Sequence, residues 1–319
     1  MKKFFYRKSI ILGSGPAGCT SAIYLARANL NPILITGNYK GGQLTSSYSI
    51  ENWPGESFKI SGKELMQKML KHVKMFLKSE NMIDDHINKV DFLNKPFKLF
   101  GLNNNYACDS LIISTGSSNR YLEVPNEKKF IGNGISTCAT CDGFIYRNKI
   151  VAVIGGGNSA IEESLFLSKI AKEVHIIHRR KEFRAEKVLI KRLEREKENK
   201  KIFFHKNFIV RSFSGKSVIH SINLISSDGK TEKKISIDGV FIAIGKIPNT
   251  KIFSKQISLK HGYIITNKEN DLNKTQTSID GIFAAGDVAD SEYRQAITAA
   301  GFGCMAAIDL IRYLENTNT

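Results

Sequence analysis

Two cysteines three positions apart, Cys138 and Cys141, are the residues of this sequence best suited to redox chemistry. Ala139 and Thr140 separate them, and Asp142 follows directly. Two intervening residues allow a disulfide to open and close with little movement of the backbone. One thiolate of such a pair attacks the disulfide of a partner molecule, and the other thiol resolves the mixed disulfide. The spacing therefore predicts dithiol–disulfide exchange.

A zinc site is the main alternative for a close cysteine pair. Structural zinc takes four ligands, usually from two such pairs or from one pair with closely spaced histidines. The sequence has no second C-x-x-C, and the next histidine downstream is His175, inside an apolar run that is typical of a strand. A permanent structural disulfide is not expected in the cytosol. Redox chemistry is therefore the favoured interpretation, and no metal is expected.

The residues alone leave two roles open for Asp142. Its carboxyl group could donate or accept a proton as a thiol leaves, or it could cap a helix. A helix that begins at the cysteine pair would lower the pKa of one thiol. The isolated cysteines, Cys19, Cys108 and Cys304, are expected to be small core residues.

Two glycine-rich turns would position cofactors for this chemistry. Each follows an apolar strand and precedes a helical pattern and a second apolar strand, as at the start of a βαβ unit. The pyrophosphate of a dinucleotide needs a tight turn, close approach of the backbone and a helix N-terminus, and this arrangement supplies all three. The turns are Gly13-Ser14-Gly15-Pro16-Ala17-Gly18 and Gly155-Gly156-Gly157-Asn158-Ser159-Ala160. They predict two dinucleotide-binding domains.

The end of the second strand indicates which cofactor the second domain binds. An NAD site usually places an acidic residue about 20 residues beyond the turn, where it bonds the ribose 2′-hydroxyl. This unit has His178-Arg179-Arg180 there instead, with Arg184 four residues further on. A carboxylate would repel a 2′-phosphate, whereas arginines bind it through charged, forked hydrogen bonds. The second unit is therefore predicted to bind NADPH.

The first unit departs from both nicotinamide patterns. Its second strand ends in Thr36-Gly37, with neither an acidic residue nor an arginine. The stretch Gly41-Gly42-Gln43 follows, and its glycines allow the backbone to approach a ligand closely. This pattern fits FAD, held by other contacts, better than a second nicotinamide cofactor.

The order of these motifs predicts that one domain is inserted into the other. Apolar strands at 111–116 and 240–245 end in glycine, one late in each unit, and the chain is expected to cross between domains just after them. The expected fold is α/β, with two Rossmann-like domains of the three-layer ββα type. The FAD domain would comprise residues 1–118 and 248–319. The NADPH domain, which carries the cysteine pair, would comprise residues 119–247.

Composition restricts the other classes of function. The chain has 47 Lys and Arg against 30 Asp and Glu, a formal net charge of +17, which invites comparison with nucleic-acid-binding proteins. The basic residues are scattered, however, and the sequence contains no helix-turn-helix, finger or RNA-recognition motif. We therefore expect no nucleic-acid partner. A protein this basic would still attract acidic partners.

Targeting and membrane segments are also not expected. The N-terminal Met1-Lys2-Lys3-Phe4-Phe5 resembles the start of a signal peptide, but the apolar run after it is too short. We expect no segment that approaches the 18 or more apolar residues of a membrane span. These observations predict a cytoplasmic protein with no membrane partner.

The motifs together resemble those of bacterial thioredoxin reductases of the low-molecular-weight type, class II pyridine nucleotide-disulfide oxidoreductases. The resemblance covers essentially the whole chain. It rests on Gly13–Gly18, Lys40-Gly41-Gly42-Gln43-Leu44-Thr45, Glu51-Asn52-Trp53-Pro54-Gly55, Cys138-Ala139-Thr140-Cys141-Asp142-Gly143, Gly155–Asn158, His178-Arg179-Arg180, Gly286-Asp287-Val288 and Tyr293-Arg294-Gln295-Ala296-Ile297-Thr298.

The resemblance implies a homodimer with one FAD per subunit and thioredoxin as partner. It implies that Cys141 lies nearest the flavin, that Cys138 exchanges with thioredoxin, and that Asp142 takes the acid–base role. The expected FAD contacts, including strand-end glycine turns, are Gly13, Ser14, Gly15, Pro16, Ala17, Thr36, Gly37, Gly41, Gly42, Gln43, Asn52, Thr115, Gly116, Gly286, Asp287, Arg294, Gln295 and Ala296. The expected NADPH contacts are Gly155, Gly157, Asn158, Ser159, His178, Arg179, Arg180 and Arg184.

The reaction expected from these assignments is thioredoxin-disulfide reduction. NADPH would reduce FAD, FAD would reduce the Cys138–Cys141 disulfide, and the dithiol would reduce oxidised thioredoxin. A helix that begins near Gln295-Ala296 would aim backbone N–H groups at the flavin and stabilise negative charge on its reduced form. The alternative is a related NADPH-dependent flavoprotein reductase that acts on a different dithiol or disulfide protein.

Overall fold

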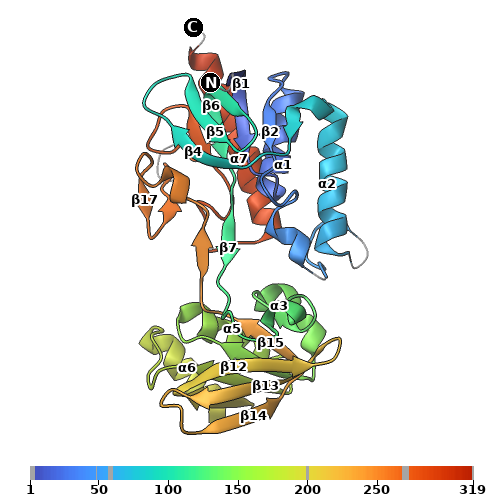
Figure 1. Ribbon diagram of the computed structural model, residues 1–319, viewed down its shortest axis with the longest axis vertical. Coiled ribbons are helices and arrows are strands. Elements are labelled where there is room, and N and C mark those ends of the chain that lie inside the picture. The colour runs from blue at the N-terminus through green and yellow to red at the C-terminus, as the bar shows by residue number, and fades with distance from the viewer. Residues whose placement is uncertain (1–3, 48, 57–59, 199–200, 268–272, 318–319) are drawn as a thin grey trace. The chain divides into compact units, whose positions relative to one another are not determined.

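The computed structural model describes residues 4–47, 49–56, 60–198, 201–267 and 273–317 of the chain. The chain divides into two compact units, both drawn in Figure 1. Unit 1 consists of residues 1–47, 53–118 and 247–319, and unit 2 consists of residues 48–52 and 119–246. Met1, Lys2 and Lys3, where the sequence resembles the start of a signal peptide, lie outside the described residues.

A mostly parallel sheet forms the centre of unit 1, in the order β3-β2-β1-β6-β5-β4. One edge of β6 pairs with β1 along its length, and its other edge pairs first with β5 and then with β19. Ile10 and Ile11 in β1 are completely buried, as expected for a strand covered on both faces. The strands are β1 (Phe4–Leu12), β2 (Ile33–Ile35), β3 (Met82–Ile83), β4 (Ile87–Asp91), β5 (Phe97–Gly101), β6 (Asn105–Ile113) and β19 (Ile282–Ala284).

Helices α1 (Pro16–Arg27), α2 (Gly62–Phe76) and α7 (Ala296–Thr317) share one apolar cluster with the sheet of unit 1. Proline is well suited to the first position of α1, where the missing N–H would have no helical partner. A capping box of Ser61 and Glu64 fixes the start of α2. The shorter elements of this unit are η1 (Gln43–Ser46), η2 (Ser79–Asn81), η4 (Lys251–Phe253), β17 (Leu259–Lys260) and β18 (Tyr263–Ile264).

Unit 2 contains a parallel sheet in the order β11-β10-β9-β15-β8 and an antiparallel sheet in the order β12-β13-β14. One apolar cluster lies between the parallel sheet and the helices, and a second lies between the two sheets. The parallel strands are β8 (Ile135–Ser136), β9 (Ile150–Ile154), β10 (Glu173–His178), β11 (Ile202–Lys206) and β15 (Gly239–Ile242). The antiparallel strands are β12 (Phe208–Gly215), β13 (Ile219–Ser226) and β14 (Glu232–Ser236).

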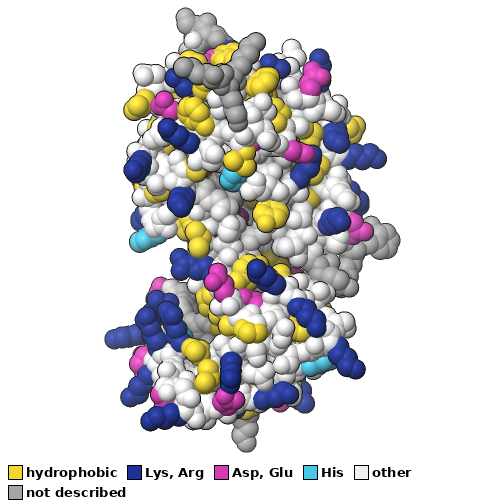
Figure 2. Space-filling model, viewed as in Figure 1, with side chains coloured by type: hydrophobic (Ala, Val, Ile, Leu, Met, Phe, Trp, Pro, Cys, Tyr) yellow, Lys and Arg dark blue, Asp and Glu magenta, His cyan; other side chains and the backbone are white. Residues whose placement is uncertain are grey.

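The helices of unit 2 are α3 (Glu127–Phe130), α4 (Ala139–Asp142), η3 (Gly143–Tyr146), α5 (Asn158–Ser168) and α6 (Lys187–Glu198). Helices, parallel sheet and antiparallel sheet give three layers, which confirms the predicted α/β class with Rossmann-like domains. Helix α6 is amphipathic and rich in Lys, Arg and Glu. Lys and Arg side chains are spread over the face shown in Figure 2, with a gathering in unit 2 on the side where α6 lies.

The chain leaves unit 1 and returns to it through two short strands that pair with each other, β7 (Ser117–Asn119) and β16 (Lys246–Pro248). Backbone hydrogen bonds flank this pair at both ends. The N–H of Asn249 donates to the carbonyl of Gly116 at 2.9 Å, and that of Arg120 donates to the carbonyl of Gly245 at 3.2 Å. Both crossings therefore lie side by side.

Helix α7 corrects one expectation from the sequence. It has 22 residues, and its most apolar 18-residue stretch has a mean hydropathy of 1.4, so by length and composition alone it could cross a membrane. The expectation that no segment comes near this limit is wrong for α7. A core helix passes the same test, and α7 buries Ala306, Ala307 and Leu310 completely in the cluster that it shares with α1.

The packing of α7 on α1 predicts opposite effects for two glycines of α7. A Cβ added at Gly303 would lie 2.2 Å from the carbonyl oxygen of Ala17, whereas one at Gly301 would meet nothing within 4 Å. We expect Gly303→Ala to destabilise the protein by about 1–3 kcal/mol, because the two helices must separate. Gly301→Ala should stabilise it by about 0.5–1 kcal/mol, because alanine loses less backbone entropy in a helix. Urea denaturation of both variants tests this, and equal effects would contradict the packing.

Candidate redox and dinucleotide-binding sites

The predicted cysteine pair forms a disulfide at the start of a helix. Cys138 and Cys141 are bonded, with their Cα atoms 5.3 Å apart. Cys138 has extended backbone and occupies the N-cap of α4, so Cys141 lies within the first turn of this helix. Both cysteines are half-buried. The disulfide is thus accessible to solvent at one side, which exchange with another protein requires.

Asp142 lies directly behind the pair in an environment that favours its neutral form. Ser136 Oγ donates a hydrogen bond to Asp142 Oδ2 at 2.5 Å, and the backbone N–H of Cys138 donates to Ser136 Oγ at 3.1 Å. Among the described residues, Asp142 Oδ1 is buried without a hydrogen-bond partner. Burial raises the pKa of Asp142, and the bond from Ser136 opposes part of this rise. The carboxyl group is therefore placed to hold a proton beside the sulfurs.

The helix-cap role that the sequence left open for Asp142 does not match this geometry. Asp142 precedes the short helix η3, but its side chain makes no capping hydrogen bond there. The bond with Ser136 replaces it. Sequence reasoning did not single out Ser136, although a serine two positions before a redox cysteine was the available signal.

The second glycine turn brings three parts of unit 2 together. Gly155 has φ +156, and a Cβ there would lie 2.4 Å from the carbonyl oxygen of Ala243. Gly157 forms the N-cap of α5 without a side-chain cap, and a Cβ there would meet nothing within 4 Å. The N-terminus of α5 thus faces open space, as phosphate binding requires. The N–H of Arg184 donates to the carbonyl of Gly156 at 2.7 Å and closes the turn.

Two of the predicted NADPH contacts have structural partners within the protein. The amide side chain of Asn158 donates to Glu186 Oε1 and accepts from the N–H of Glu186, both at 2.9 Å. His178 is buried, and a Cβ at Gly156 would lie 2.4 Å from its ring. Burial lowers the pKa of His178, which favours the uncharged ring. The ring packs against Gly156 of the turn. The predicted arginines are exposed around it: Arg179, Arg180 and Arg184.

The first glycine turn has the same construction in unit 1. Gly13 has φ +112, and a Cβ there would lie 2.3 Å from the carbonyl oxygen of Ser114. Gly15 is the N-cap of α1 without a side-chain cap, and a Cβ there would meet nothing within 4 Å. Ser14 Oγ donates to the carbonyl of Thr36 at 2.9 Å and accepts from the N–H of Gly41 at 3.0 Å. Ser14 therefore ties the turn to the end of β2 and to the glycine stretch that follows it.

A carboxylate that the sequence did not predict lies at the end of β2. Thr36 Oγ1 donates to Asp84 Oδ1 at 2.7 Å, and Lys40 Nζ donates to the same oxygen at 2.9 Å. These bonds lower the pKa of Asp84, the one from Thr36 most, and keep its carboxyl group ionised. Asp84 comes 48 residues after Thr36, so the signal for it was only that it follows the apolar strand β3.

The C-terminal turn leads into α7. Ser117 Oγ donates to Asp287 Oδ2 at 3.3 Å, next to Gly286, which has φ +78. Thr115 is bonded in both directions to Asn249: its hydroxyl donates to the Asn249 carbonyl at 2.9 Å, and its own carbonyl accepts from the Asn249 amide at 2.8 Å.

The loop between this turn and α7 is held by a residue that the sequence did not single out. The carboxylate of Asp290 accepts from the backbone N–H groups of Glu292, Tyr293 and Arg294 at 2.9–3.1 Å. Asp290 thereby shapes the segment that precedes the N-terminus of α7. Another predicted FAD contact, Asn52, lies in the segment that groups with unit 2.

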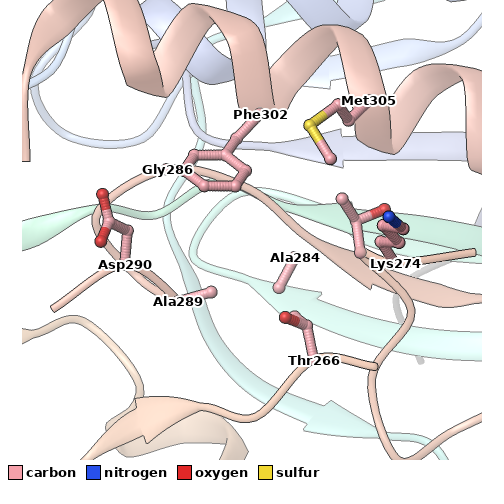
Figure 3. A pocket seen from close by; sticks show the side chains of 9 residues that line it. Thr266, Lys274, Ala284, Gly286, Ala289, Asp290, Phe302 and Met305 are labelled. Carbon is pink, nitrogen blue, oxygen red and sulfur yellow. The ribbon is translucent and has the colours of Figure 1, made fainter. Parts of the chain in front are cut away.

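A small pocket lies between the turn at Gly286 and α7 (Figure 3). Phe302 and Met305 of α7 line one side, and Ala284 and Ala289 line the other. Gly286 is the one predicted cofactor contact among its lining residues. The mostly apolar lining does not suit a pyrophosphate, so the first glycine turn remains the candidate dinucleotide site of unit 1.

Comparison with known proteins relates the whole chain to oxidoreductases. The sequence pattern of the family described as "Pyridine nucleotide-disulphide oxidoreductase" matches residues 7–303. A thioredoxin reductase of Escherichia coli O157:H7 is 54% identical over 312 residues, 97% of each chain. A glucosaminate ammonia-lyase of Pseudomonas fluorescens is 51% identical over 97% of this chain and 96% of its own. The crystal structure of thioredoxin reductase from Streptococcus pyogenes MGAS5005 is similar with a TM-score of 0.88, 35% identity and coverage of 98% and 99%.

The environment of Asp142 predicts a pH-dependent gain in stability when its charge is removed. The pKa of Asp142 is raised in the folded protein. Its contribution to the free energy of unfolding is therefore most favourable below the pKa that it has in the unfolded chain, and it is lost as the pH rises through the pKa that it has in the folded protein. We expect Asp142→Asn to raise the thermal unfolding midpoint of the protein more at pH 8 than at pH 4.

Asp228→Asn is the control for this prediction. The pKa of Asp228 is lowered by its bond from Ser226, so neutralising it should lower the midpoint more at pH 8 than at pH 4. Differential scanning calorimetry at both pH values measures the two changes. A gain from Asp142→Asn that is independent of pH would contradict the raised pKa.

Proposed function

Because the chain belongs to the pyridine nucleotide-disulphide oxidoreductase family, we propose that it is an NADPH-dependent flavoprotein that reduces oxidised thioredoxin. The observation that carries the proposal is the half-buried Cys138–Cys141 disulfide at the start of α4. It lies in unit 2 together with the second glycine turn and the exposed arginines that follow β10. A related NADPH-dependent reductase that acts on a different dithiol or disulfide protein is the alternative.

The residues of unit 1 fit FAD. Gly15, Gly37 and Gly116 each have open space where a Cβ would stand, and the N-terminus of α1 has no side-chain cap. A dinucleotide needs such a surface, because its pyrophosphate approaches the backbone and the helix N-terminus closely. The FAD domain would comprise 1–118 and 248–319. Residues of unit 1 that would hold the cofactor are the first glycine turn, Thr36 to Gln43, Thr115, Gly116, and Gly286 to Ala296. Asn52, which groups with unit 2, is the other predicted contact.

The residues of unit 2 fit NADPH. Gly157 leaves open space at the N-terminus of α5 for a pyrophosphate, and the exposed arginines Arg179, Arg180 and Arg184 would bind a 2′-phosphate. The asparagine and histidine of the predicted contact set, Asn158 and His178, support the site by holding its turn in place. The NADPH domain would comprise residues 119–247.

Bound FAD and NADPH supply a pair of electrons for reduction of the disulfide. The pair then acts as a dithiol. The sulfur of Cys138 attacks the thioredoxin disulfide, one S–S bond breaks, and a mixed disulfide forms. The sulfur of Cys141 attacks Cys138 in turn, which closes the original disulfide and releases thioredoxin with two reduced sulfurs.

Asp142 would donate a proton to the sulfurs and accept one from them in these steps. Reduction of the disulfide produces thiolates that take up protons, and re-oxidation releases them. Because Ser136 Oγ donates to Oδ2 of Asp142, a proton carried by Asp142 belongs on Oδ1, the oxygen without a partner among the described residues. Ser136 thus acts as a positioning residue for the acid.

The proposed assembly and location rest on the family resemblance. We propose a homodimer with one FAD per subunit in the cytoplasm, supported by the similarity to bacterial thioredoxin reductases over nearly the whole chain. Two free cysteines are buried, Cys19 and Cys108, and burial raises the pKa of the Cys19 thiol to about 12. Reduced, unreactive thiols of this kind are compatible with the cytoplasm.

Replacement of one redox cysteine tests the dithiol mechanism. We expect Cys141→Ser to retain FAD and to lose essentially all NADPH-driven reduction of thioredoxin, because the disulfide can no longer form. Cys304→Ser is the control, since it removes a free thiol from unit 1. The assays are the flavin absorption spectrum and thioredoxin-dependent oxidation of NADPH. A Cys141→Ser enzyme with full activity would refute the mechanism.

Replacement of the exposed arginines tests the choice of nicotinamide cofactor. We expect Arg179→Gln with Arg180→Gln to raise the KM for NADPH by about tenfold or more, the effect of losing hydrogen bonds to a charged group. The KM for NADH should change little, because NADH has no 2′-phosphate. Lys191→Gln, on the exposed face of α6, controls for the loss of positive charge. Equal losses with NADPH and NADH would contradict the assignment.

A further inference from the structure

The end of β2 lacks the acidic residue with which dinucleotide sites hold a ribose. We propose that Asp84, supplied by the neighbouring strand, takes this place and accepts a hydrogen bond from a ribose hydroxyl in the adenosine half of the flavin dinucleotide. The inference rests on the proposed binding of FAD to unit 1. It adds a residue outside the motifs on which the family resemblance rests.

The sheet brings Asp84 to the required position. Strands β2 and β3 are parallel neighbours in which Ile35 is paired with Ile83, and both strands end at these residues. Thr36 directly follows β2, and Asp84 directly follows β3. The backbone N–H of Thr36 donates to the carbonyl of Ile83 at 2.9 Å. Carboxyl ends of parallel strands are where α/β sheets bind ligands. Asp84 therefore lies one strand away from the usual position of the ribose-binding acid.

The side chain of Asp84 is oriented and ionised. Its Oδ1 accepts from Thr36 Oγ1 at 2.7 Å and from Lys40 Nζ at 2.9 Å. Two bonds fill the usual capacity of one carboxylate oxygen. Among the described residues, Oδ2 accepts only one bond, a longer one of 3.2 Å from Lys40, which leaves room for a hydroxyl donor. The side chain is 68% exposed, so a ligand can reach it.

The surroundings of Asp84 suit a ligand better than a purely structural ion pair. Gly37, with φ +77, has open space where a Cβ would stand, so the chain beside Thr36 does not cover the strand end. An exposed ion pair with Lys40 alone contributes little to stability. The additional bond from the Thr36 hydroxyl holds the carboxylate against the strand end that a dinucleotide would occupy.

Titration of the apoprotein with FAD provides the direct test. After removal of bound flavin, quenching of flavin fluorescence gives the dissociation constant without any measurement of turnover. We expect Asp84→Asn to weaken FAD binding by about tenfold, because a hydrogen bond to a charged group is lost. Asp280→Asn removes the same charge from another exposed position of unit 1 and should leave the affinity unchanged. Unchanged affinity in Asp84→Asn overturns the inference.

A ligand pair identifies the group that Asp84 binds. ADP and 2′,3′-dideoxy-ADP compete with FAD for the apoprotein, and they differ only in the ribose hydroxyls. Wild-type protein should prefer ADP by about tenfold, and Asp84→Asn should lose this preference, which is the coupling expected for direct contact. A preference that survives in Asp84→Asn overturns the inference while FAD binding upholds the proposed function. Wild-type apoprotein that does not bind FAD overturns both.

Discussion

Close approaches of glycine to the backbone of neighbouring residues determine where the two candidate dinucleotide sites of this protein lie. A Cβ at Gly18 would stand 1.8 Å from the carbonyl of Gly13, and one at Gly155 would stand 2.4 Å from that of Ala243. Only glycine lets the backbone pass this close to a neighbouring carbonyl group between a strand and the helix that follows it. The N-termini of α1 and α5 are consequently directed at open space, and the strands beside them end at the same edge of their sheets. Arginines, threonine and carboxylates then collect along those edges.

The sequence predicted the features that depend on interactions between residues close together in the chain. The apolar runs that became β9 and β10, the glycine turns and the C-x-x-C pair all depend on residues that are close in the chain. Contacts between distant residues were not predictable, because they require the register of the sheet. Thr36 meets Asp84 across 48 residues, and Asn158 meets Glu186 across 28. Helix α7 was misjudged because alanine and glycine suit a helix-packing surface and a membrane span alike.

Two carboxyl groups show how the fold assigns different charges to one type of side chain. Burial of the Asp142 carboxyl group outweighs the bond that it accepts from Ser136, so its pKa is raised and it can carry a proton. Asp84 is exposed and receives bonds from a hydroxyl and an ammonium group, so its pKa is lowered and it stays an acceptor. The first state suits exchange of protons with sulfur, and the second suits binding of a hydroxyl.

Because the crossings β7 and β16 pair with each other, the inserted part of unit 2 could be exchanged for another domain. Its main segment, residues 119–246, begins and ends on two strands that pair with each other, and strands paired in this way are about 5 Å apart. A short bridge between the crossings would restore an uninterrupted unit 1, and any other domain whose termini are equally close would fit the same opening. Recombination can therefore replace the inserted unit without rebuilding the sheet of unit 1.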